Sequence, residues 1–480
     1  MTLPENIARR KDCLIFGEVG GQLVAAVADP MDVSVRAALE SGYDRPLQYV
    51  VSPRFQIRAA IDEIYGPSRA TGSRLRTGPP PAHRVATASA TGLNMVEQLD
   101  SIIDEAVDRR ASDIHIEPME DRLRVRMRID GRMIEARAYP LDASAALVSR
   151  VKVLSELDIT ERRKPQDGRF RHRSFDQELD IRVAVIPTVR GERVTMRLLS
   201  QDRSRLTLEN LGMGIELRQA FERLILRPYG IILITGPTGS GKTTTLYAAL
   251  QRINSTDKHI VTIEDPVEYQ IDGVNQVHVD TEFGVSFAAA LRSLLRHDPD
   301  VLMVGEIRDQ ETAHLALEAA LTGHLVLATL HTNTAVGAVT RLLDMGCEPY
   351  LVASSLIGVM AQRLVRKICT NCKRAYEPNA TERRILRIPP DRRGVEIHRG
   401  AGCTRCLRSG YYDRVGIFEF VPFDSGLAEL VMDKAPTDKL QEYAVQHGAI
   451  TLRDDAIQKV RDGLTTLEEA LRVTTLTGAD

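Results

Sequence analysis

The chain has 480 residues, 27% of them charged and 43% hydrophobic, which is typical of a globular protein and long enough for about three domains. A net charge of -2 excludes a global electrostatic field that would attract nucleic acid or an anionic lipid surface. The first residues lack the apolar core of a secretory signal, and no apolar run approaches the roughly 18 residues of a membrane span, so we expect a cytosolic protein.

The N-terminal residues 1–66 have the pattern of a small α/β module. Strand-like runs occupy 13–16 and 22–28, and helical patterns occupy 32–40 and 53–65, with Asp32 and Ser52 as caps. No catalytic constellation is visible there, which favours a docking or packing module. Residues 67–92 are rich in Pro, Gly, Ser, Thr and Ala and poor in large apolar side chains, so they are predicted to form a flexible linker.

Residues 93–203 are predicted to form an α+β domain. Its helices are expected at 94–110 and 143–157, and its strands at 112–117, 122–129, 168–175, 178–186 and 192–199. Four arginines alternate with apolar residues in the second strand and therefore share one face: Arg122, Arg124, Arg126 and Arg128. That face is either solvated or directed toward the acidic surface or nucleotide of a neighbouring subunit. The last strands carry Arg169, Arg182 and Arg197. For Arg182 and Arg197 the simplest expectation is a local ion pair, with Asp180 and Glu192 respectively.

The next strand leads into a glycine loop that matches the P-loop pattern G-x-x-x-x-G-K-[ST] at every fixed position. The β-branched run 231–234 precedes the loop, and helical spacing resumes after it. Glycines allow backbone N–H groups to converge on phosphate oxygens, and the following helix N-terminus favours an anion. The alternative is a glycine-rich turn before a helix. The expected nucleotide-binding residues are Gly236, Pro237, Thr238, Gly239, Ser240, Gly241, Lys242, Thr243 and Thr244; Lys242 is expected on the β- and γ-phosphates and Thr243 on Mg²⁺.

Three further apolar strands each deliver polar residues at their C-terminal ends, where open α/β sheets bind ligands. Strand 261–263 leads to Glu264, Asp265 and Glu268; strand 301–304 leads to Glu306; strand 325–330 leads to His331. Together with the P-loop they predict a nucleoside triphosphatase over 204–365.

Charge suggests the roles of these side chains. Glu306 is expected to orient and polarise the attacking water, and Glu264, Asp265 and Glu268 to hold Mg²⁺ through its water molecules. His331 either senses the γ-phosphate or is a hydrogen-bonded histidine at a strand end. Arg292 and Arg296 are predicted to share a helix face, and Arg308 to pair with Asp309 or Glu306. Which arginine reaches a phosphate across a subunit boundary stays open.

Two C-x-x-C pairs lie within 366–420: Cys369 with Cys372, and Cys403 with Cys406. Four thiolates make a closed tetrahedral site, so the pattern predicts a structural Zn²⁺. A redox C-x-x-C is the alternative, but no thioredoxin-like context accompanies it. Residues 421–480 are expected to be helical, including 439–446 and 466–472.

The motifs jointly resemble the type II/IV secretion and pilus-assembly ATPases over about 93–420, and more weakly over 1–66. The matching segments are TGPTGSGKTTTLYAAL (Walker A), VTIEDPVEYQ (Asp box), DPDVLMVGEIRD (Walker B) and LTGHLVLATLHTN (His box). The tetracysteine element resembles the branch of type II secretion motors and type IV pilus extension motors, and other segments are most similar to the type II branch. The resemblance implies a RecA-like core, a PAS-like α+β domain before it, and a homohexamer that hydrolyses ATP at subunit boundaries.

By the same resemblance, Glu306 matches the catalytic glutamate, Glu264 the key acid of the Asp box, and His331 the His-box histidine. Arg182 and Arg197 match PAS-like-domain arginines that approach the nucleotide, and Arg292, Arg296 and Arg308 match further functional arginines. The N-terminal module looks like one that binds the cytoplasmic part of an inner-membrane partner or, in some relatives, cyclic di-GMP, although no convincing glycine-leucine repeat for that ligand is present.

The sequence therefore predicts a cytosolic hexameric ATPase that couples Mg-ATP hydrolysis to pseudopilus assembly and protein export, held peripherally at the inner membrane by platform proteins. A type IV pilus extension motor is the first alternative. A nucleic-acid translocase on a RecA-like core is a second, from a different class, but a pI near 6.6 and 5% aromatic residues argue against it. A nucleotide-sensing module with incidental hydrolysis is a third.

Overall fold

The computed structural model describes residues 95–475 except 175–176, 201–206 and 390, and parts of the first 64 residues: 3, 7–8, 11–19, 21–27, 29–30, 32–40, 43, 46–52, 57, 60–61 and 64. The predicted linker 67–92 and most of the predicted helix 53–65 lie outside the described residues. None of the helices in the described part is long and apolar enough to cross a bilayer.

The N-terminal unit contains a small sheet and is described here by itself. Strands β1 (Cys13–Val19) and β2 (Gln22–Val27) pair antiparallel, and β3 (Leu47–Val51) adds parallel to β2. Helix α2 (Val33–Glu40) makes the crossover between the two parallel strands. Leu14, Ala25 and Leu39 are buried in its hydrophobic cluster. The predicted α/β character is confirmed for the described residues, although the half-exposed strand β3 had no clear sequence signal.

The second unit begins with an antiparallel sheet, which within the described residues has the order β6-β5-β4-β9-β8-β7. Its strands are β4 (Ala111–Pro118), β5 (Arg122–Ile129), β6 (Arg132–Pro140), β7 (Gln166–Ser174), β8 (Gln177–Thr188) and β9 (Gly191–Ser200). The helices are α4 (Met95–Asp108) and α5 (Ala143–Leu154). Helix α4 buries Leu99, Ile102 and Ile103 at helical spacing, as predicted. Strand β6 was not predicted, because its half-buried residues do not alternate cleanly.

Each of the four arginines of β5 lies within ion-pair distance of a carboxylate of the same chain. Strand β5 alternates between half-buried arginines and buried apolar residues, so the predicted common face exists. On that face Arg124 and Arg126 pair with Glu117, at 3.0 and 2.7 Å, and Arg128 pairs with Asp113 at 3.2 Å. The acids come from the neighbouring strand β4, and cross-strand pairing of this kind is invisible until the register is known.

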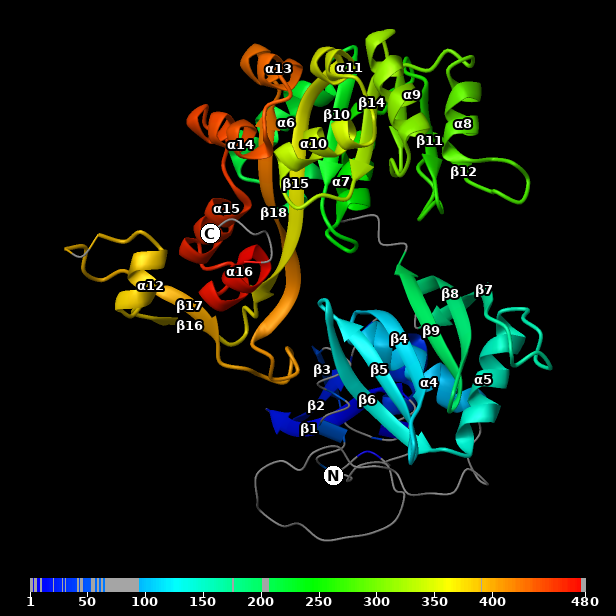
Figure 1. Cartoon of the computed structure of the whole chain (residues 1–480). Coiled ribbons are helices and arrows are strands. Elements are labelled where there is room, and N and C mark those ends of the chain that lie inside the picture. The colour runs from blue at the N-terminus through cyan, green and yellow to red at the C-terminus, as the bar shows by residue number, and fades with distance from the viewer. Residues whose placement is uncertain are drawn as a thin grey trace. The chain divides into compact units, whose positions relative to one another are not determined.

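A mostly parallel sheet forms the centre of the second unit, and Figure 1 shows its strands with helices around them. Its order in the described part is β12-β11-β13-β14-β10-β15-β18, with only β18 antiparallel to its neighbour. The strands are β10 (Gly230–Thr235), β11 (Ile260–Glu264), β12 (Asn275–His278), β13 (Val301–Val304), β14 (Leu325–Leu330), β15 (Leu356–Ile368) and β18 (Tyr411–Pro422). Strand β18 therefore joins this sheet from the segment 366–420 that carries the cysteines.

Helices cover both faces of this sheet, so its central strands are buried on both sides. One face packs against η3 (Leu208–Leu211), α6 (Ile215–Ile225) and α7 (Lys242–Ile253), through residues such as Phe221 and Leu246. The other packs against α8 (Phe287–Leu294), α9 (Gln310–Leu321), α10 (Ala335–Asp344) and α11 (Pro349–Ser355). All residues of β10, β11, β13 and β14 are buried, which explains their continuous apolar runs.

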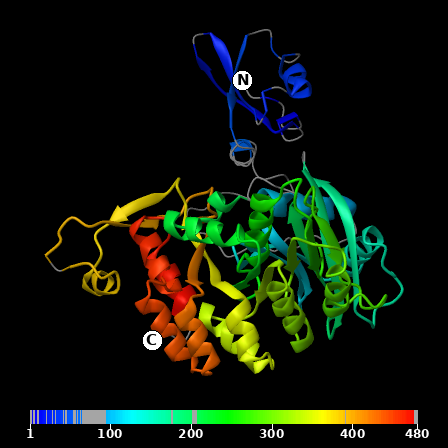
Figure 2. The same ribbon diagram turned by 90° about the horizontal axis from the view of Figure 1, so that it is seen from above.

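The C-terminal part adds a small hairpin with helix α12 and, after β18, four further helices that are orange to red in Figure 2. Strands β16 (Lys373–Tyr376) and β17 (Ile397–Gly400) pair antiparallel, with α12 (Ala380–Ile385) between them in the chain. Helices α13 (Ser425–Met432), α14 (Thr437–Gln446), α15 (Leu452–Arg461) and α16 (Leu467–Thr474) follow. Their buried side chains extend the core on the face that carries α8 to α11.

Candidate nucleotide-binding site

The glycine loop after β10 has a backbone that only glycine can adopt without strain. Gly236, Gly239 and Gly241 have φ angles of 150°, 78° and 88°. A Cβ at Gly236 would lie 2.4 Å from the carbonyl oxygen of Gln362, and a Cβ at Gly241 would lie 2.8 Å from Nε2 of the same residue. Helix α7 begins at Lys242, directly after the loop. The backbone N–H groups of its first turn have no partner within the helix and are available to an anion held by the loop. The geometry is that of an anion cradle.

Lys242 lies over the loop and is almost fully buried. Its Nζ donates to the carbonyl oxygens of Gly236, at 2.8 Å, and Pro237, at 3.2 Å. Burial lowers the pKa of Lys242 to about 8, and the charge of Glu306 opposes this only in part. The electrostatic attraction between this buried ammonium group and a bound phosphate is stronger than it would be for an exposed lysine, because the local dielectric constant is lower. Thr243 is exposed at the helix start, and Thr244 is half-buried.

The ends of β13 and β14 bring an acid and a histidine together. Glu306 follows β13 and His331 follows β14, and Nε2 of His331 lies 3.5 Å from Oε2 of Glu306. Arg308 pairs with Glu306 and also lies 3.5 Å from Oδ2 of Asp265. Burial opposes ionisation of Glu306, but the hydrogen bond and charge of Arg308, with His331 and Lys242, hold its pKa below the ordinary value. Glu306 is therefore a carboxylate, able to accept a hydrogen bond from water.

Glu264, which the sequence analysis expects to hold Mg²⁺ through water, is buried at the end of β11. It is only 3% exposed, and its carboxylate accepts hydrogen bonds from Thr262 Oγ1 at 2.6 Å and Gln276 Nε2 at 3.0 Å. Tyr247 also donates its hydroxyl to Glu264. A Cβ on Gly305 would lie 3.1 Å from the carbonyl oxygen of Ile263, so glycine at 305 allows the ends of β13 and β11 to approach closely. In this structure the hydrogen bonds of Glu264 connect α7, β11 and β12 below the ends of the strands.

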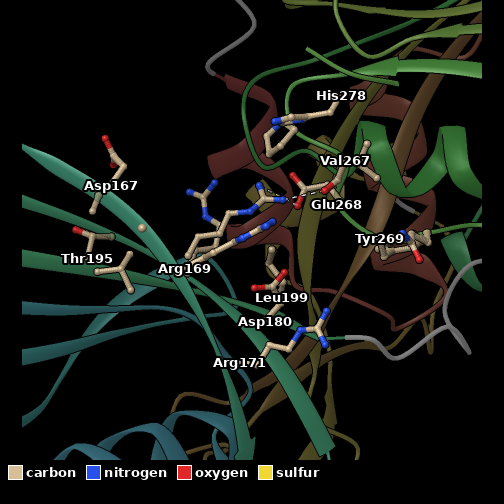
Figure 3. Close-up of a pocket in the computed structure, with 17 residues that line it drawn as sticks. Asp167, Arg169, Arg171, Asp180, Thr195, Leu199, Val267, Glu268, Tyr269 and His278 are labelled. Atoms are coloured by element: carbon tan, nitrogen blue, oxygen red, sulfur yellow. Dashed lines mark hydrogen bonds and ion pairs between the residues drawn. The ribbon is translucent and has the colours of Figure 1, made fainter. Parts of the chain in front are cut away.

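A large cavity of about 980 Å³ lies between the edge strands of the antiparallel sheet and the segment after β11. Figure 3 shows Arg169 and Arg171 on one side, and Glu268, Tyr269 and His278 on the other. Arg182 crosses it: Nη2 donates to the carbonyl oxygen of Val267 at 2.9 Å, and Nη1 lies 3.6 Å from Glu268. Arg197 lines the same cavity and pairs with Asp113 at 3.0 Å. The local pairs expected with Asp180 and Glu192 were therefore wrong, because each arginine reaches a different element.

Arg292 and Arg296 have partners outside the P-loop. Arg292 pairs with Glu311 of α9, and Nη1 of Arg296 donates to the carbonyl oxygen of Arg292 at 2.8 Å. Helix α8 ends at Leu294, so the expected shared helix face does not exist. Arg308 does pair locally with Glu306, one of the two partners expected for it.

The four cysteines form a second cluster. Their Sγ atoms all lie within 4.8 Å of one another, and three of the separations are 3.6 to 3.8 Å. A tetrahedral zinc with Zn–S bonds of about 2.3 Å requires S–S edges of about 3.8 Å. Backbone N–H groups of Gly402 and Gly410 donate to Sγ of Cys372 and Cys406, each at 3.3 Å, which favours thiolates. The donor set fits a closed structural zinc site.

Sequence reasoning missed the part that β15 contributes. Gln362 accepts a hydrogen bond from Thr245 Oγ1 at 2.7 Å, which ties β15 to the first turn of α7. Arg363, the next residue, lines a cavity together with P-loop residues. A signal was available, because Gln362 and Arg363 interrupt a strand that is apolar on both sides of them, but nothing in the sequence shows that β15 pairs directly with β10.

Comparisons with known proteins identify the family of this chain. The model of the family described as type II/IV secretion system protein matches residues 89–472, and that of the MshEN domain matches 1–71. The chain is 49% identical to the type II secretion system ATPase E of Vibrio cholerae, over 79% of this chain and 75% of that protein. It is 42% identical to the type IV pilus assembly ATPase PilB of Myxococcus xanthus, over 98% and 85% of the two chains.

A crystal structure of the pilus retraction motor PilT with bound ADP is similar, with a TM-score of 0.54 and 30% identity over 78% of this chain and 96% of that one. The predicted RecA-like fold and the predicted ATPase activity are confirmed by these matches together. The chain therefore belongs to the family of type II/IV secretion system proteins, and it is an ATPase of that family.

Proposed function

We propose that this chain works as a homohexamer, coupling Mg-ATP hydrolysis to assembly of a pseudopilus and to protein export in a type II secretion system. The main structural support for ATP hydrolysis is that Glu306, His331 and Arg308 lie together at the ends of neighbouring strands beside the P-loop. The similarity to the Vibrio cholerae ATPase supports the type II system as the machine that it serves.

The site residues divide the work of phosphoryl transfer between them. The P-loop from Gly236 to Thr243 holds the phosphates, with Lys242 on the terminal ones. Glu306 accepts a hydrogen bond from the attacking water and aligns it, while His331 and Arg308 keep its carboxylate ionised and in place. Mg²⁺, when bound near Thr243, supplies charge neutralisation for the phosphates. Asp265 and Glu268 lie near enough to arginines to change partners when nucleotide binds.

Arginines from outside the P-loop complete the site in this proposal. Arg182 and Arg197 approach the nucleotide from the PAS-like domain, and Arg292 and Arg296 act from an adjacent subunit of the ring. In support, Arg182 already contacts the segment after β11, and Arg292 and Arg296 lie on an exposed edge. Such arginines add about 10³- to 10⁵-fold to the rate of related phosphoryl transfers.

We further propose that the four cysteines hold a structural Zn²⁺ and that the N-terminal module connects the hexamer to an inner-membrane platform protein. The chain itself would then be cytoplasmic and peripherally attached. The sulfur geometry supports the zinc, and the family match of residues 1–71 supports a separate N-terminal module.

A type IV pilus extension motor is the second candidate, favoured by a match to PilB that spans 98% of this chain. One experiment separates the two. In the source organism, replacing the gene with the Glu306→Gln variant should remove the secreted enzymes from the culture medium and leave surface pili intact. Loss of pili with normal export would assign the chain to the pilus machine instead.

A further inference from the structure

The neighbours of β10 define two sides of the P-loop. Strands β14 and β13 lie on one side and deliver His331 and Glu306, so the terminal phosphate of a bound nucleotide points there. Strand β15 lies on the other side of β10, and its Gln362 accepts a hydrogen bond from Thr245 of α7, so its polar side chains are candidates to meet the phosphates that ADP and ATP share. This reasoning rests on the nucleotide-binding function proposed above.

A cavity of about 210 Å³ lies on that side. P-loop residues 237–240 form one wall, and Arg363 and Arg366 of β15 with Glu469 and Arg472 of α16 form another. The two guanidinium groups from β15 have similar burial, at 7% and 5% exposed. Their surroundings differ sharply.

Arg366 has its charge compensated inside the protein. Its Nη2 lies 2.7 Å from Oε2 of Glu469, and its guanidinium lies 3.8 Å from the centre of the Tyr411 ring. Glu469 is 1% exposed and also pairs with Arg472. The Nε of Arg366 has no hydrogen-bond partner among the described residues, but the charge as a whole faces a carboxylate. Arg366 is therefore part of a buried ion-pair network that the fold itself satisfies.

Arg363 has no such compensation. Within the described part of the chain, no carboxylate lies within ion-pair distance of it, and its Nε has no hydrogen-bond partner. Among the described residues, its guanidinium donates one side-chain hydrogen bond, from Nη2 to Oδ1 of Asn333 at 3.0 Å, and this partner is a neutral amide. Burial without a counter-charge lowers the pKa of Arg363. A buried cation of this kind is unfavourable unless an anion arrives.

A second unsatisfied donor faces the same cavity. Ser240 of the P-loop is 3% exposed, and its Oγ has no hydrogen-bond partner among the residues that the structure describes. Buried hydroxyl groups are normally hydrogen-bonded, so an unpaired one beside an uncompensated guanidinium is a second, independent indication of a missing anionic ligand.

We propose that Arg363 is a nucleotide-binding residue that donates hydrogen bonds to a phosphate common to ADP and ATP, with the Ser240 hydroxyl donating beside it. The Nε of Arg363 is buried and unpaired, and a guanidinium group has a fork geometry that suits a phosphate oxygen pair. The P-loop then holds the phosphate chain from two sides: Lys242 over the loop and Arg363 from β15.

The test is nucleotide binding to the full-length protein, measured by titration calorimetry with ADP and with a non-hydrolysable ATP analogue in the presence of Mg²⁺. Arg363→Gln should weaken both affinities by a similar factor, about 10- to 100-fold, as expected for one charge-assisted interaction. The melting temperature of the nucleotide-free variant should be unchanged or higher, because an uncompensated buried charge is removed. Arg363→Lys should recover part of the affinity.

Arg366→Gln is the matched control, since it removes an arginine of equal burial from the same strand and cavity. It should lower the nucleotide-free melting temperature, because Glu469 loses a partner, and should change ADP affinity much less than Arg363→Gln does. Unchanged affinities in Arg363→Gln, a loss confined to the ATP analogue, or a fall in its nucleotide-free melting temperature as large as that of the control would overturn the inference. If the wild-type protein bound neither nucleotide, the proposed function itself would fail.

Discussion

Glu306 illustrates how neighbouring charges determine the role of a single side chain. Burial alone would raise its pKa, yet Arg308, His331 and Lys242 together keep it ionised. A carboxylate in this state is suited to fix and polarise a water molecule, and its low basicity matches a reaction whose transition state is mainly stabilised by positioning and charge.

Replacing Glu306 by glutamine keeps the size of the side chain and removes its charge. We expect kcat for ATP hydrolysis to fall by about 10²- to 10⁴-fold, the usual contribution of such a group, while ATP still binds. Binding persists because the P-loop and Lys242 are untouched. Steady-state phosphate release together with ATP titration checks both parts, and full turnover in the variant would remove Glu306 from the mechanism.

Lys242 should make nucleotide binding depend on pH in the alkaline range. Its pKa of about 8 without nucleotide means that it loses its proton as the pH rises past that value, whereas a bound phosphate favours the charged form. ADP binding should therefore weaken as the pH rises above about 8 and should take up protons there, but not near pH 6.5. Calorimetry in buffers of different ionisation enthalpy measures the uptake. Identical alkaline proton uptake by Lys242→Arg, whose guanidinium stays charged, would contradict this origin.

At the scale of elements, the sheet edge organises the site more than any single loop does. Strands β13 and β14 carry the reacting side chains, β11 leads to Asp265, and β15 supports the P-loop through Gln362. The segment 366–420 also has two parts: β18 completes the ATPase sheet, while the hairpin β16–β17 lies beside the cysteines. Loss of the cysteine cluster can therefore disturb β18, because β18 follows Cys406 closely in the chain.

The cysteine cluster predicts a zinc content that depends on particular residues. Purified protein should contain a single zinc ion per chain, and Cys403→Ser should lose it and melt at a lower temperature, because structural zinc sites stabilise their folded segment strongly. Cys347→Ala is the matched control: Cys347 is also buried but lies outside the cluster. Metal analysis and thermal melting give both readouts. Equal zinc in the two variants would place the metal elsewhere.

Much of the sheet was predictable because buried parallel strands read as short apolar runs, and polar residues mark their ends. The runs at 231–234, 301–304 and 325–330 coincide with β10, β13 and β14. The local pair of Arg308 with Glu306 was among those predicted, but side-chain partners on other strands and elements were not predictable. Arg182, Arg197 and the β5 arginines pair across strands or elements, and the burial of Glu264 under Tyr247 depends on packing. Such contacts require the register and the tertiary fold, which local patterns do not contain.

At the scale of the whole molecule, the site in one chain lacks cations that the proposal assigns to an adjacent subunit. Arg292 and Arg296 lie on the exposed α8 edge, where Arg292 pairs with Glu311. If they complete the site in a ring, assembly and activity are coupled. The carboxylate of Glu311 must then release Arg292 when a neighbouring nucleotide approaches.

Specific ATPase activity should therefore rise with protein concentration and level off once the ring has formed. The rise reflects arginines that reach the nucleotide only in the assembled ring, a contribution of about 10³- to 10⁵-fold in related enzymes. Mass photometry and phosphate release on the same samples compare oligomer size with rate. An Arg296→Gln ring that forms normally but hydrolyses ATP slowly would support the shared site. Equal activity per chain in a monomeric sample would refute it.

The most direct test of the central claim is Mg²⁺-dependent ATP hydrolysis by the purified full-length protein at concentrations where it assembles, compared with Lys242→Ala. The account predicts steady phosphate release by the wild-type protein and its loss in the variant, because the ammonium group over the P-loop is removed. Equal release by both proteins, or none by the wild type, would contradict it.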